Sequence, residues 1–306
     1  MSTYLVTGGA GFIGSHVVEL LRTRGHEAIV LDDLSKGVPT NVPADVPLHE
    51  VDIADREAVL ACSAKLPPLA AVIHCAAQSS VVVSTTDPAR DLLVNVAGTI
   101  NVLDVCAQLR CPMAFTSTGG AIYGESAPRP TPETEATEPG APYGASKASA
   151  EIYIRLWARQ SGLPHAILRL GNVYGPRQRG DGEAGVVAII AERLRDGAPI
   201  TLYGHGTPTR DYVHVSDVAR ALVDAVGING TFNIATGVET SVQEVYDLAV
   251  TAFSGEVTSE PTLADLRPGE LSASCLDITR ARTTLGWSPE IAVSEGIPAT
   301  VRSLLS

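Results

Sequence analysis

The stretch Thr7-Gly8-Gly9-Ala10-Gly11-Phe12-Ile13-Gly14 decides the fold; it ends one short apolar run and opens a helix-like segment. It fits both G-x-G-x-x-G and G-x-x-G-x-x-G. Glycines permit the tight turn, the close approach of backbone N–H groups to a pyrophosphate, and the packing of helix on strand. The N-terminus of the helix adds partial positive charge. The stretch therefore predicts a dinucleotide site rather than an unliganded glycine turn. Its candidate cofactor-binding residues are Gly8, Gly11, Phe12, Ile13 and Gly14.

The first half of the chain alternates short apolar runs with helix-like segments. The runs lie at residues 4–7, 28–32, 70–75 and 112–117, and each ends at small or polar residues. Residues 14–24, between the first two runs, have apolar residues at mostly helical spacing and stop at Gly25. This alternation predicts an α/β fold, a Rossmann-type doubly wound parallel sheet with helices on both faces.

Proline and glycine divide the rest of the chain. Residues 127–142 contain five prolines among small and acidic residues, which predicts a long surface loop. Helical periodicity follows at residues 143–160 and again at about residues 184–196. β-like runs come at residues 199–203 and 231–234, where the alternation is irregular.

The division into domains follows from where the alternation stops. We expect residues 1–174 to form an NAD-binding domain, to which residues 210–236 return. Residues 175–306 are expected to form mainly a smaller C-terminal substrate-binding region. The boundary near residue 175 is soft, because the segment 210–226 again has the pattern of the main sheet.

Composition excludes several classes of protein. The 306 residues are 45% apolar and carry 22 basic against 34 acidic side chains, a net charge of −12. This balance excludes disorder and disfavours nucleic-acid binding. The longest apolar candidate, residues 185–191, falls well short of the roughly 18 residues that cross a bilayer. The five cysteines are scattered and the seven histidines lack metal-ligand spacing. With no secretory leader, we expect a cytoplasmic protein without metal or membrane contact.

Asp32 ends the second apolar run, eighteen positions after Gly14. A carboxylate at this place accepts hydrogen bonds from an adenosine ribose diol. Its charge would repel the 2′-phosphate of NADP, so the sequence predicts NAD as the cofactor. The alternative is a structural role, in which Asp32 caps the next turn through Ser35.

Tyr143 and Lys147 are four residues apart on a predicted helix and therefore share one face. With three lysines and eight tyrosines in the chain, a chance match at this spacing is rare. A tyrosine pKa near 10 must fall by about three units for the phenolate to act as a base at pH 7. A neighbouring ammonium and the positive nicotinamide ring both favour the phenolate. A surface pair without catalytic role is the alternative.

Hydroxyl side chains end the fourth apolar run, at Thr116-Ser117-Thr118. The carboxyl ends of parallel strands are where ligands bind in open α/β sheets. Ser117 and Thr118 are therefore further catalytic candidates. The alternative for each is a hydroxyl that caps the backbone at the strand end.

Together these features resemble the extended short-chain dehydrogenase/reductase family, and specifically its nucleotide-sugar epimerases. The resemblance covers nearly the whole chain. Later segments that agree with it are LGNVYGPR at 170–177, LYG at 202–204, TRDYVHV at 209–215, RPGE at 267–270 and LGWSP at 285–289.

The resemblance implies a cofactor, NAD, and a UDP-sugar substrate. It places the following residues at the cofactor: Asp52 and Ile53 beside adenine, Ala76, Ala77 and Asn95 along the site, and Lys147 at the nicotinamide ribose. It places these at the substrate: Asn172, Arg210 and Arg267 at the diphosphate, Thr201 and Tyr203 against uracil, and Glu270 at the uridine ribose. It also suggests a homodimer, formed through helices around residues 95–109 and 151–159.

The resemblance also favours one reaction. Family members that eliminate water or CO₂ usually carry an acid just before the tyrosine that corresponds to Tyr123, where this chain has Gly120 and Ala121. The site thus resembles a 4-epimerase, in which Tyr143 takes the O4 proton, hydride leaves C4 for NAD, and the 4-ketose turns before hydride returns. The usual position of the catalytic hydroxyl holds Gly119. Thr118 is the nearest hydroxyl and Ser117 the alternative.

Arg179 bears on the identity of the sugar. In similar uronate epimerases an arginine at this position meets the C5 carboxylate, so the favoured substrates are UDP-glucuronate and UDP-galacturonate. If Arg179 is an exposed loop residue, the alternative is a UDP-glucose/UDP-galactose 4-epimerase. A nucleotide-sugar dehydratase or decarboxylase, or a non-catalytic NAD-binding regulator, are more distant alternatives.

Overall fold

The computed structural model describes the chain except residues 181–184, 256, 258–259, 268–269 and 306. It divides into two compact units, each discontinuous in sequence. Unit 1 comprises Met1–Thr118, Ala141–Arg169 and Val218–Phe232, and unit 2 comprises Gly119–Gly140, Leu170–Asp217 and Asn233–Ser306. The expected boundary near residue 175 is therefore wrong: unit 1 ends first at Thr118, and residues 119–140 and 170–174 fold with the C-terminal part. The returning segment is also shorter than the predicted 210–236.

Unit 1 is built on a seven-stranded sheet with the order β11-β6-β5-β4-β1-β2-β3. Its strands are β1 Thr3–Thr7, β2 Glu27–Asp32, β3 Leu48–Glu50, β4 Ala71–His74, β5 Met113–Thr118, β6 His165–Leu170 and β11 Gly230–Ile234. The pairs of β1 with β2 and β4, of β2 with β3, and of β4 with β5 are all parallel. The strand order reverses at β1, which is where open α/β sheets bind their ligands.

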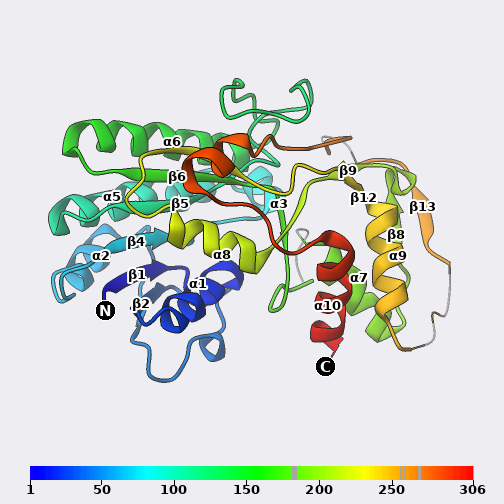
Figure 1. The fold of residues 1–306 in the computed structure, drawn as a ribbon, viewed down its shortest axis with the longest axis horizontal. Coiled ribbons are helices and arrows are strands. Elements are labelled where there is room, and N and C mark those ends of the chain that lie inside the picture. Colours follow the sequence, from blue (N-terminus) through cyan, green and yellow to red (C-terminus); the bar gives the residue numbers. More distant parts are fainter. Residues whose placement is uncertain (181–184, 256, 258–259, 268–269, 306) are drawn as a thin grey trace. The chain divides into compact units, whose positions relative to one another are not determined.

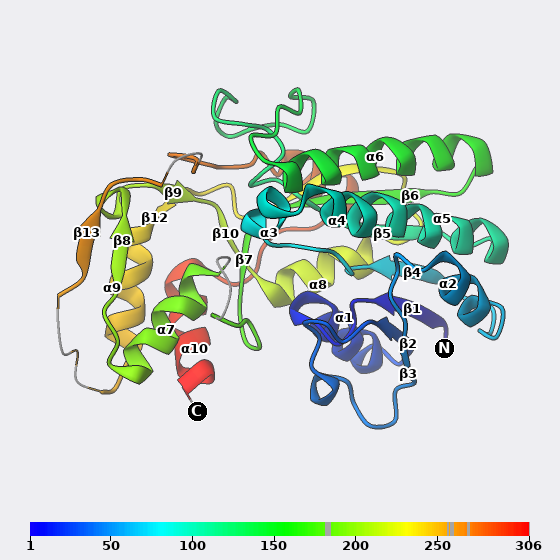
Figure 2. The ribbon, with the colours of Figure 1, turned by 180° about the vertical axis from the view of Figure 1, so that it is seen from behind.

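Helices cover both faces of this sheet, which confirms the doubly wound α/β fold. They are α1 Phe12–Thr23, α2 Arg56–Ser63, α3 Val81–Thr86, α4 Pro88–Leu92, α5 Gly98–Leu109, α6 Pro142–Ser161 and α8 Val215–Asp224. Figure 1 shows α2, α5 and α6 on one face and α1 with α8 on the other, and Figure 2 shows the same layers from behind. An ion pair of 2.6 Å between Arg24 and Asp224 connects the ends of α1 and α8.

The helix α6 follows the predicted pattern closely. Pro142 is its first residue, where a missing N–H costs no hydrogen bond, and Gly162 ends it with a φ of 71°. The helix α1 begins at Phe12, two residues before the predicted start, because the backbone of Gly11 already caps it. The predicted helix from about residue 184 begins at Val186, and Ala184 lies outside the described residues.

Unit 2 contains short strands in pairs and three longer helices. The strands are β7 Asn172–Tyr174, β8 Thr201–Tyr203, β9 Thr209–Arg210, β10 Tyr212–His214, β12 Thr240–Ser241 and β13 Thr262–Ala264. They pair as β7 with β10, β8 with β13, and β9 with β12. The helices α7 Val186–Asp196, α9 Val242–Ala252 and α10 Val293–Leu305 enclose a core that includes Tyr174, Tyr212 and Ile297.

The proline-rich segment is not wholly a surface loop. Its residues 127–141 contain no helix or sheet strand, as predicted, yet Thr131 among them is buried. The N–H of Thr131 donates to the carbonyl of Cys275 at 2.9 Å, and Nδ2 of Asn233 donates to the carbonyl of Thr131 at 2.8 Å. Backbone groups in the middle of the segment thus fix it to the rest of unit 2.

One helical run, Pro88–Leu109, is long and apolar enough to cross a membrane by length and composition, and half of it is buried in the fold. The run joins α4 and α5 through a π-helical turn at Leu93–Ala97. The sequence-based prediction that no such stretch exists is therefore wrong, because it considered only uninterrupted apolar residues. Buried helices of globular folds pass the same test, so the run by itself indicates no membrane contact.

Candidate functional site

The glycine loop between β1 and α1 leaves no room for side chains. Gly8 has a φ of 67°, and a Cβ there would lie 2.6 Å from the backbone nitrogen of Ala76. A Cβ on Gly14 would lie 2.1 Å from the carbonyl oxygen of Gly8. Gly11 is the N-cap of α1. The loop therefore has the close backbone approach and the helix N-terminus that a dinucleotide pyrophosphate needs, so the residues present fit NAD.

Asp32 closes this loop from the end of β2. Its carboxylate accepts hydrogen bonds from the N–H of Ala10 and the N–H of Leu34, both at 2.9 Å. Burial raises its pKa. Ser35 bonds to Asp33 instead, so the predicted alternative of a cap through Ser35 is wrong. Asp32 does cap the turn after β2, through Leu34, and its role toward a ribose remains a prediction.

Other predicted cofactor residues lie near the carboxyl ends of β3 and β4. The carboxylate of Asp52 accepts from the N–H of Ala54 at 2.8 Å, and Nδ2 of Asn101 donates to the carbonyl of Ile53 at 2.8 Å. Ala76 and Ala77 follow β4, and the N–H of Ala76 donates to the hydroxyl of Thr7. All four residues belong to unit 1.

Asn95 is the centre of a buried hydrogen-bond network on the π-helical turn. Its Oδ1 accepts from the N–H of Gln78 at 2.9 Å, and its Nδ2 donates to Oδ1 of Asp91 at 3.0 Å and to Oγ of Ser146 at 3.1 Å. The Ser146 hydroxyl in turn donates to the carbonyl of Tyr143 at 3.0 Å. Sequence reasoning missed Gln78, Asp91 and Ser146. Their local sequence carries no signal for this network, because the three residues come from separate segments of the chain.

Tyr143 and Lys147 lie in the first two turns of α6, and Lys147 is only 2% exposed. The alternative of a surface pair is therefore wrong. The Lys147 ammonium lies 4.3 Å from the ring centroid of Phe115. Burial lowers the pKa of Lys147 to about 8, against the opposing influence of Cys75, Asp91 and Glu151.

The pKa of Tyr143 is raised in the chain itself, whereas the predicted lowering also included the positive charge of a bound nicotinamide. Burial, and after it the negative charge of Asp91, raise the pKa of Tyr143 to about 12. The spacing between Tyr143 and Lys147 revealed the positive charge that favours the phenolate. It revealed neither the burial of Tyr143 nor the nearby carboxylate of Asp91. The phenolate therefore needs more positive charge around it than the lysine alone supplies.

The two candidate hydroxyls on β5 have different partners. Ser117 Oγ donates to Oε1 of Glu151 at 2.7 Å in a fully buried cluster. Glu151 also accepts from the guanidinium of Arg169, at 2.9 and 2.7 Å, and from Arg155 at 3.0 Å. The Thr118 hydroxyl has no hydrogen-bond partner in the described part of the chain. Ser117 is thus held in a structural cluster, whereas the Thr118 hydroxyl is available to donate a hydrogen bond to a ligand.

Unit 2 brings four of the predicted substrate residues together in pairs. The Arg267 guanidinium carbon lies 3.8 Å from the ring centroid of Tyr203. Nη2 of Arg210 lies 3.7 Å from Oε1 of Glu270 and donates to the carbonyl of Leu271 at 2.8 Å. These contacts place two guanidinium groups and one aromatic face on neighbouring segments, a set suited to phosphate and a base.

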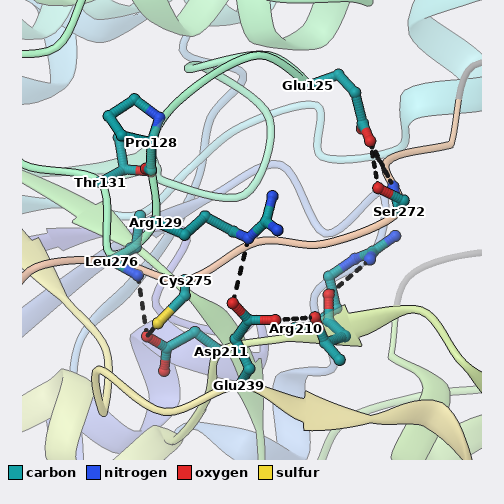
Figure 3. Close-up of polar contacts among 11 residues, drawn as sticks. Glu125, Pro128, Arg129, Thr131, Arg210, Asp211, Glu239, Ser272, Cys275 and Leu276 are labelled. Atoms are coloured by element: carbon teal, nitrogen blue, oxygen red, sulfur yellow. Dashed lines mark hydrogen bonds and ion pairs between the residues drawn. The ribbon is translucent and has the colours of Figure 1, made fainter.

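Figure 3 shows what supports Arg210. Asp211, next to it, is buried, and its carboxylate accepts from the N–H groups of Thr236, Gly237 and Leu276 at 2.7 to 3.2 Å. Arg129 of the proline-rich segment forms an ion pair of 3.1 Å with Glu239, which also accepts from the Thr209 hydroxyl. The sequence did not single out these residues, which hold β9 in place.

The remaining substrate candidates are not brought into these pairs. The N–H of Asn172, at the start of β7, donates to the carbonyl of Asp211 at 2.7 Å. A Cβ on Gly120 would lie 3.2 Å from Oδ1 of Asn172, so a larger residue at position 120 would crowd this amide. Thr201 and Arg179 are both exposed. Among the described residues there is no group of three His, Cys, Asp or Glu that could hold a metal.

Comparison with known proteins identifies relatives over the whole chain. The model of the "NAD dependent epimerase/dehydratase family" matches residues 4–235. A UDP-glucose 4-epimerase of Mycolicibacterium smegmatis is 42% identical over 97% of this chain and 96% of its own length. The Thermotoga maritima UDP-glucose 4-epimerase, solved with UDP-glucose, is 43% identical with a TM-score of 0.94, covering 98% of each chain. The Thermus thermophilus enzyme, solved with NAD, is 44% identical with a TM-score of 0.91, covering 99% of this chain and 98% of its own.

Proposed function

Because the chain belongs to the NAD dependent epimerase/dehydratase family, we propose that it interconverts UDP-glucose and UDP-galactose through a transient 4-keto sugar. The broader activity is that of an NAD-dependent UDP-sugar 4-epimerase, an isomerase. The observation that carries the choice of sugar is the identity above 40%, over nearly full length, to UDP-glucose 4-epimerases. The predicted preference for UDP-glucuronate lacks such support.

NAD, when bound, accepts a hydride from the sugar and returns it. In our proposal the glycine loop at Gly8 and Gly14 holds its pyrophosphate, and Asp32 its adenosine ribose. Asp52, Ile53, Ala76, Ala77 and Asn95 would line the same site. The carboxylate of Asp32 is already fixed by two backbone N–H groups, so its negative charge is available to favour NAD over NADP.

Tyr143 is proposed to hold and move the proton of the sugar O4. Lys147 is proposed to stabilise the phenolate through its ammonium, which must stay protonated to do so. Because its pKa is about 8, this ammonium loses its charge as the pH rises past that value. Thr118 is proposed to donate to O4, since its hydroxyl is uncommitted, while Ser117 positions the strand through Glu151.

Unit 2 is proposed to bind the UDP part of the substrate. Arg210, Arg267 and Asn172 would contact the diphosphate, Thr201 and Tyr203 the uracil, and Glu270 the uridine ribose. The position of the Arg267 guanidinium over the Tyr203 ring, 3.8 Å from its centroid, supports a stacking role for this aromatic face. Arg210 already lies beside Glu270, so one segment can present both a cation and a ribose acceptor.

The exposure of Arg179 also favours a neutral sugar. An arginine gains much from a substrate carboxylate only when the two meet in a desolvated site. Arg179 is exposed in this structure, as the alternative of a loop residue predicts. Glucose and galactose carry a hydroxymethyl group where uronates carry the carboxylate, so they need no such cation.

A direct test incubates the purified protein with UDP-glucose and, separately, with UDP-glucuronate, and separates the C4 epimers by chromatography. We expect conversion of UDP-glucose at a rate well above that of UDP-glucuronate. A preference for UDP-glucuronate would instead support the sequence-based prediction that the substrates are UDP-glucuronate and UDP-galacturonate. A product of lower mass would instead indicate loss of water or CO₂, and thus a dehydratase or decarboxylase.

A homodimer is a further part of the proposal. Large apolar side chains are exposed on unit 1 at Leu92, Leu93, Ile152 and Tyr153, which lie in or beside the two predicted dimer segments. Covering such residues with a second copy would remove apolar area from water. Light scattering during gel filtration is expected to give twice the mass of the 31.9 kDa chain. A monomer at micromolar concentration would contradict this part.

A further inference from the structure

A buried carboxylate, Asp91, is connected by hydrogen bonds to the first turn of α6, the helix that carries the proposed catalytic pair. Asp91, on α4, is 1% exposed. Its Oδ1 accepts hydrogen bonds from Nε2 of Gln78 at 2.7 Å and from Nδ2 of Asn95 at 3.0 Å, both of which are neutral amides. Within the residues that the structure covers, no lysine or arginine forms an ion pair with it. A buried charge of this kind is costly for folding, so stability does not explain it.

Glu151, a buried carboxylate with a structural role in the same unit, provides a comparison for Asp91. It is as deeply buried, but two arginines and the Ser117 hydroxyl neutralise and bond it. These partners hold the pKa of Glu151 below its usual value, in spite of burial. Glu151 also favours the Lys147 ammonium, but its own arginines offset its charge, whereas the amides that bond to Asp91 are neutral.

The Asp91 carboxylate is connected to the first turn of α6. Asn95 bonds both Asp91 and the hydroxyl of Ser146, and this hydroxyl donates to the carbonyl of Tyr143. The negative charge of Asp91 affects both Tyr143 and Lys147 on that helix. It raises the pKa of Tyr143, and it opposes the lowering of the pKa of Lys147.

Other titratable groups near Lys147 do not supply this charge. The Cys75 thiol, after β4, has its pKa raised to about 12 by burial, so it is neutral at pH 7. His74, on β4, has its pKa lowered to about 3 by burial and by Lys147, so it is neutral too. On α6 itself, the Glu151 anion is paired with Arg169. Asp91 is the negative charge near Lys147 that has no such partner.

We propose that Asp91 is a positioning residue of the epimerase, the counter-charge that keeps Lys147 protonated at neutral pH and opposes loss of the Tyr143 proton. Its kinetic consequence rests on the proposed function, whereas its effect on Lys147 does not. Gln78 and Asn95 are neutral amides, so they hold the carboxylate in place and add no positive charge beside it. An arginine in place of these amides would offset the negative charge of Asp91 and so weaken its effect on Lys147.

The test follows the titration of Lys147 by NMR. The chain has only three lysines, Lys36, Lys65 and Lys147, so a protein with ¹³C-labelled lysine gives three signals, and Lys147→Arg assigns the third. In the native protein Lys147 is expected to titrate near pH 8. Asp91→Asn removes the negative charge that favours the ammonium, so we expect titration about one pH unit lower.

Two control variants separate charge from packing. Asp91→Glu keeps the charge but changes the packing, and Lys147 is expected to titrate close to the native value. Asp104→Asn removes a carboxylate on α5 that is paired with Arg56, and no change is expected. If Asp91→Asn does not fold, the smaller neutral Asp91→Ser provides the same comparison.

An unchanged titration in the neutral variants would overturn the proposal, and so would an equal shift in Asp91→Glu. The titration needs neither NAD nor sugar, so a protein that shows the shift but epimerises no UDP-glucose would contradict the proposed function alone. In an active enzyme, Asp91→Asn is expected to move the high-pH fall of kcat/KM to lower pH by the same interval, because Lys147 loses its proton earlier.

Discussion

The candidate groups of the two units are held in different ways. In unit 1, Lys147 and Asn95 are buried and lie on helices; the Lys147 ammonium lies over the Phe115 ring, and Asn95 is held by hydrogen bonds to Gln78, Asp91 and Ser146. In unit 2, Arg267, Glu270 and Thr201 are exposed and lie on short strands or on the segments between them. Buried, regular positions suit chemistry that a whole family shares. Exposed side chains on short segments change readily without disturbing a core, so they are where substrate choice can vary.

The largest expected effect is the loss of activity when the proposed proton-transfer residue of unit 1 is replaced. Tyr143→Phe removes the hydroxyl that moves the proton, and we expect kcat for UDP-glucose epimerisation to fall by about 10³ with an unchanged fold. The matched control is Tyr153→Phe, on the exposed side of the same helix, which is expected to keep the native rate. A loss of less than tenfold in Tyr143→Phe would remove this residue from the mechanism.

The second prediction separates the two hydroxyls of β5. Thr118→Val is expected to lower kcat by about 10², because a donor to the developing oxyanion is lost, and Thr118→Ser should restore most of it. Ser117→Ala breaks a bond to Glu151, so it should lower the midpoint of thermal unfolding more than it lowers kcat. The reverse pattern in these two measurements would make Ser117 the catalytic hydroxyl.

The third prediction tests the binding role of unit 2. Arg267→Leu removes a cation from the Tyr203 face, and we expect KM for UDP-glucose to rise by a factor of about 10 with little change in kcat. Arg195→Leu, in the same unit and paired on the surface with Asp196, is the control. If kcat falls and KM does not, Arg267 acts in the chemistry and the contrast between the units fails.

The smallest expected effect concerns Arg179. Because its side chain is exposed, Arg179→Ala is expected to change kcat/KM for UDP-glucose by less than about threefold, as for surface positions generally. The same variant assayed with UDP-glucuronate sharpens the comparison. A selective loss of UDP-glucuronate turnover would mean that Arg179 meets a carboxylate after all.

Most of the fold was predictable because local patterns agree with the tertiary arrangement. Each of the four apolar runs lies within one or two residues of an observed strand, since strands buried on both faces need nearly continuous apolar residues. The strand β3, Leu48-His49-Glu50, was missed because it is a short edge strand with one apolar residue. The extent of unit 2 was missed because its segments 119–140 and 170–174 precede the place where the pattern changes.

The candidate site was predictable in its motifs but not in its electrostatics. The spacing of Tyr143 and Lys147 on one helix face is a local property, and the structure confirms that they share α6. The raised pKa of Tyr143 in the chain itself was not anticipated, because it depends on burial and on Asp91, which is 52 positions away in the sequence. The preference for a uronate depended on one arginine whose exposure no motif reveals.

The sequence by itself determined the glycine loop, the alternation of strands and helices in the first half of the chain, the NAD chemistry and the Tyr143–Lys147 pair, because these depend on residues close together in the chain. Only the tertiary structure decided which hydroxyl bonds to Glu151, that Asp91 is buried against two neutral amides, and that Arg179 is exposed. Charge effects and exposure depend on which distant segments exclude water from a group. That is a property of packing, and no local spacing contains it.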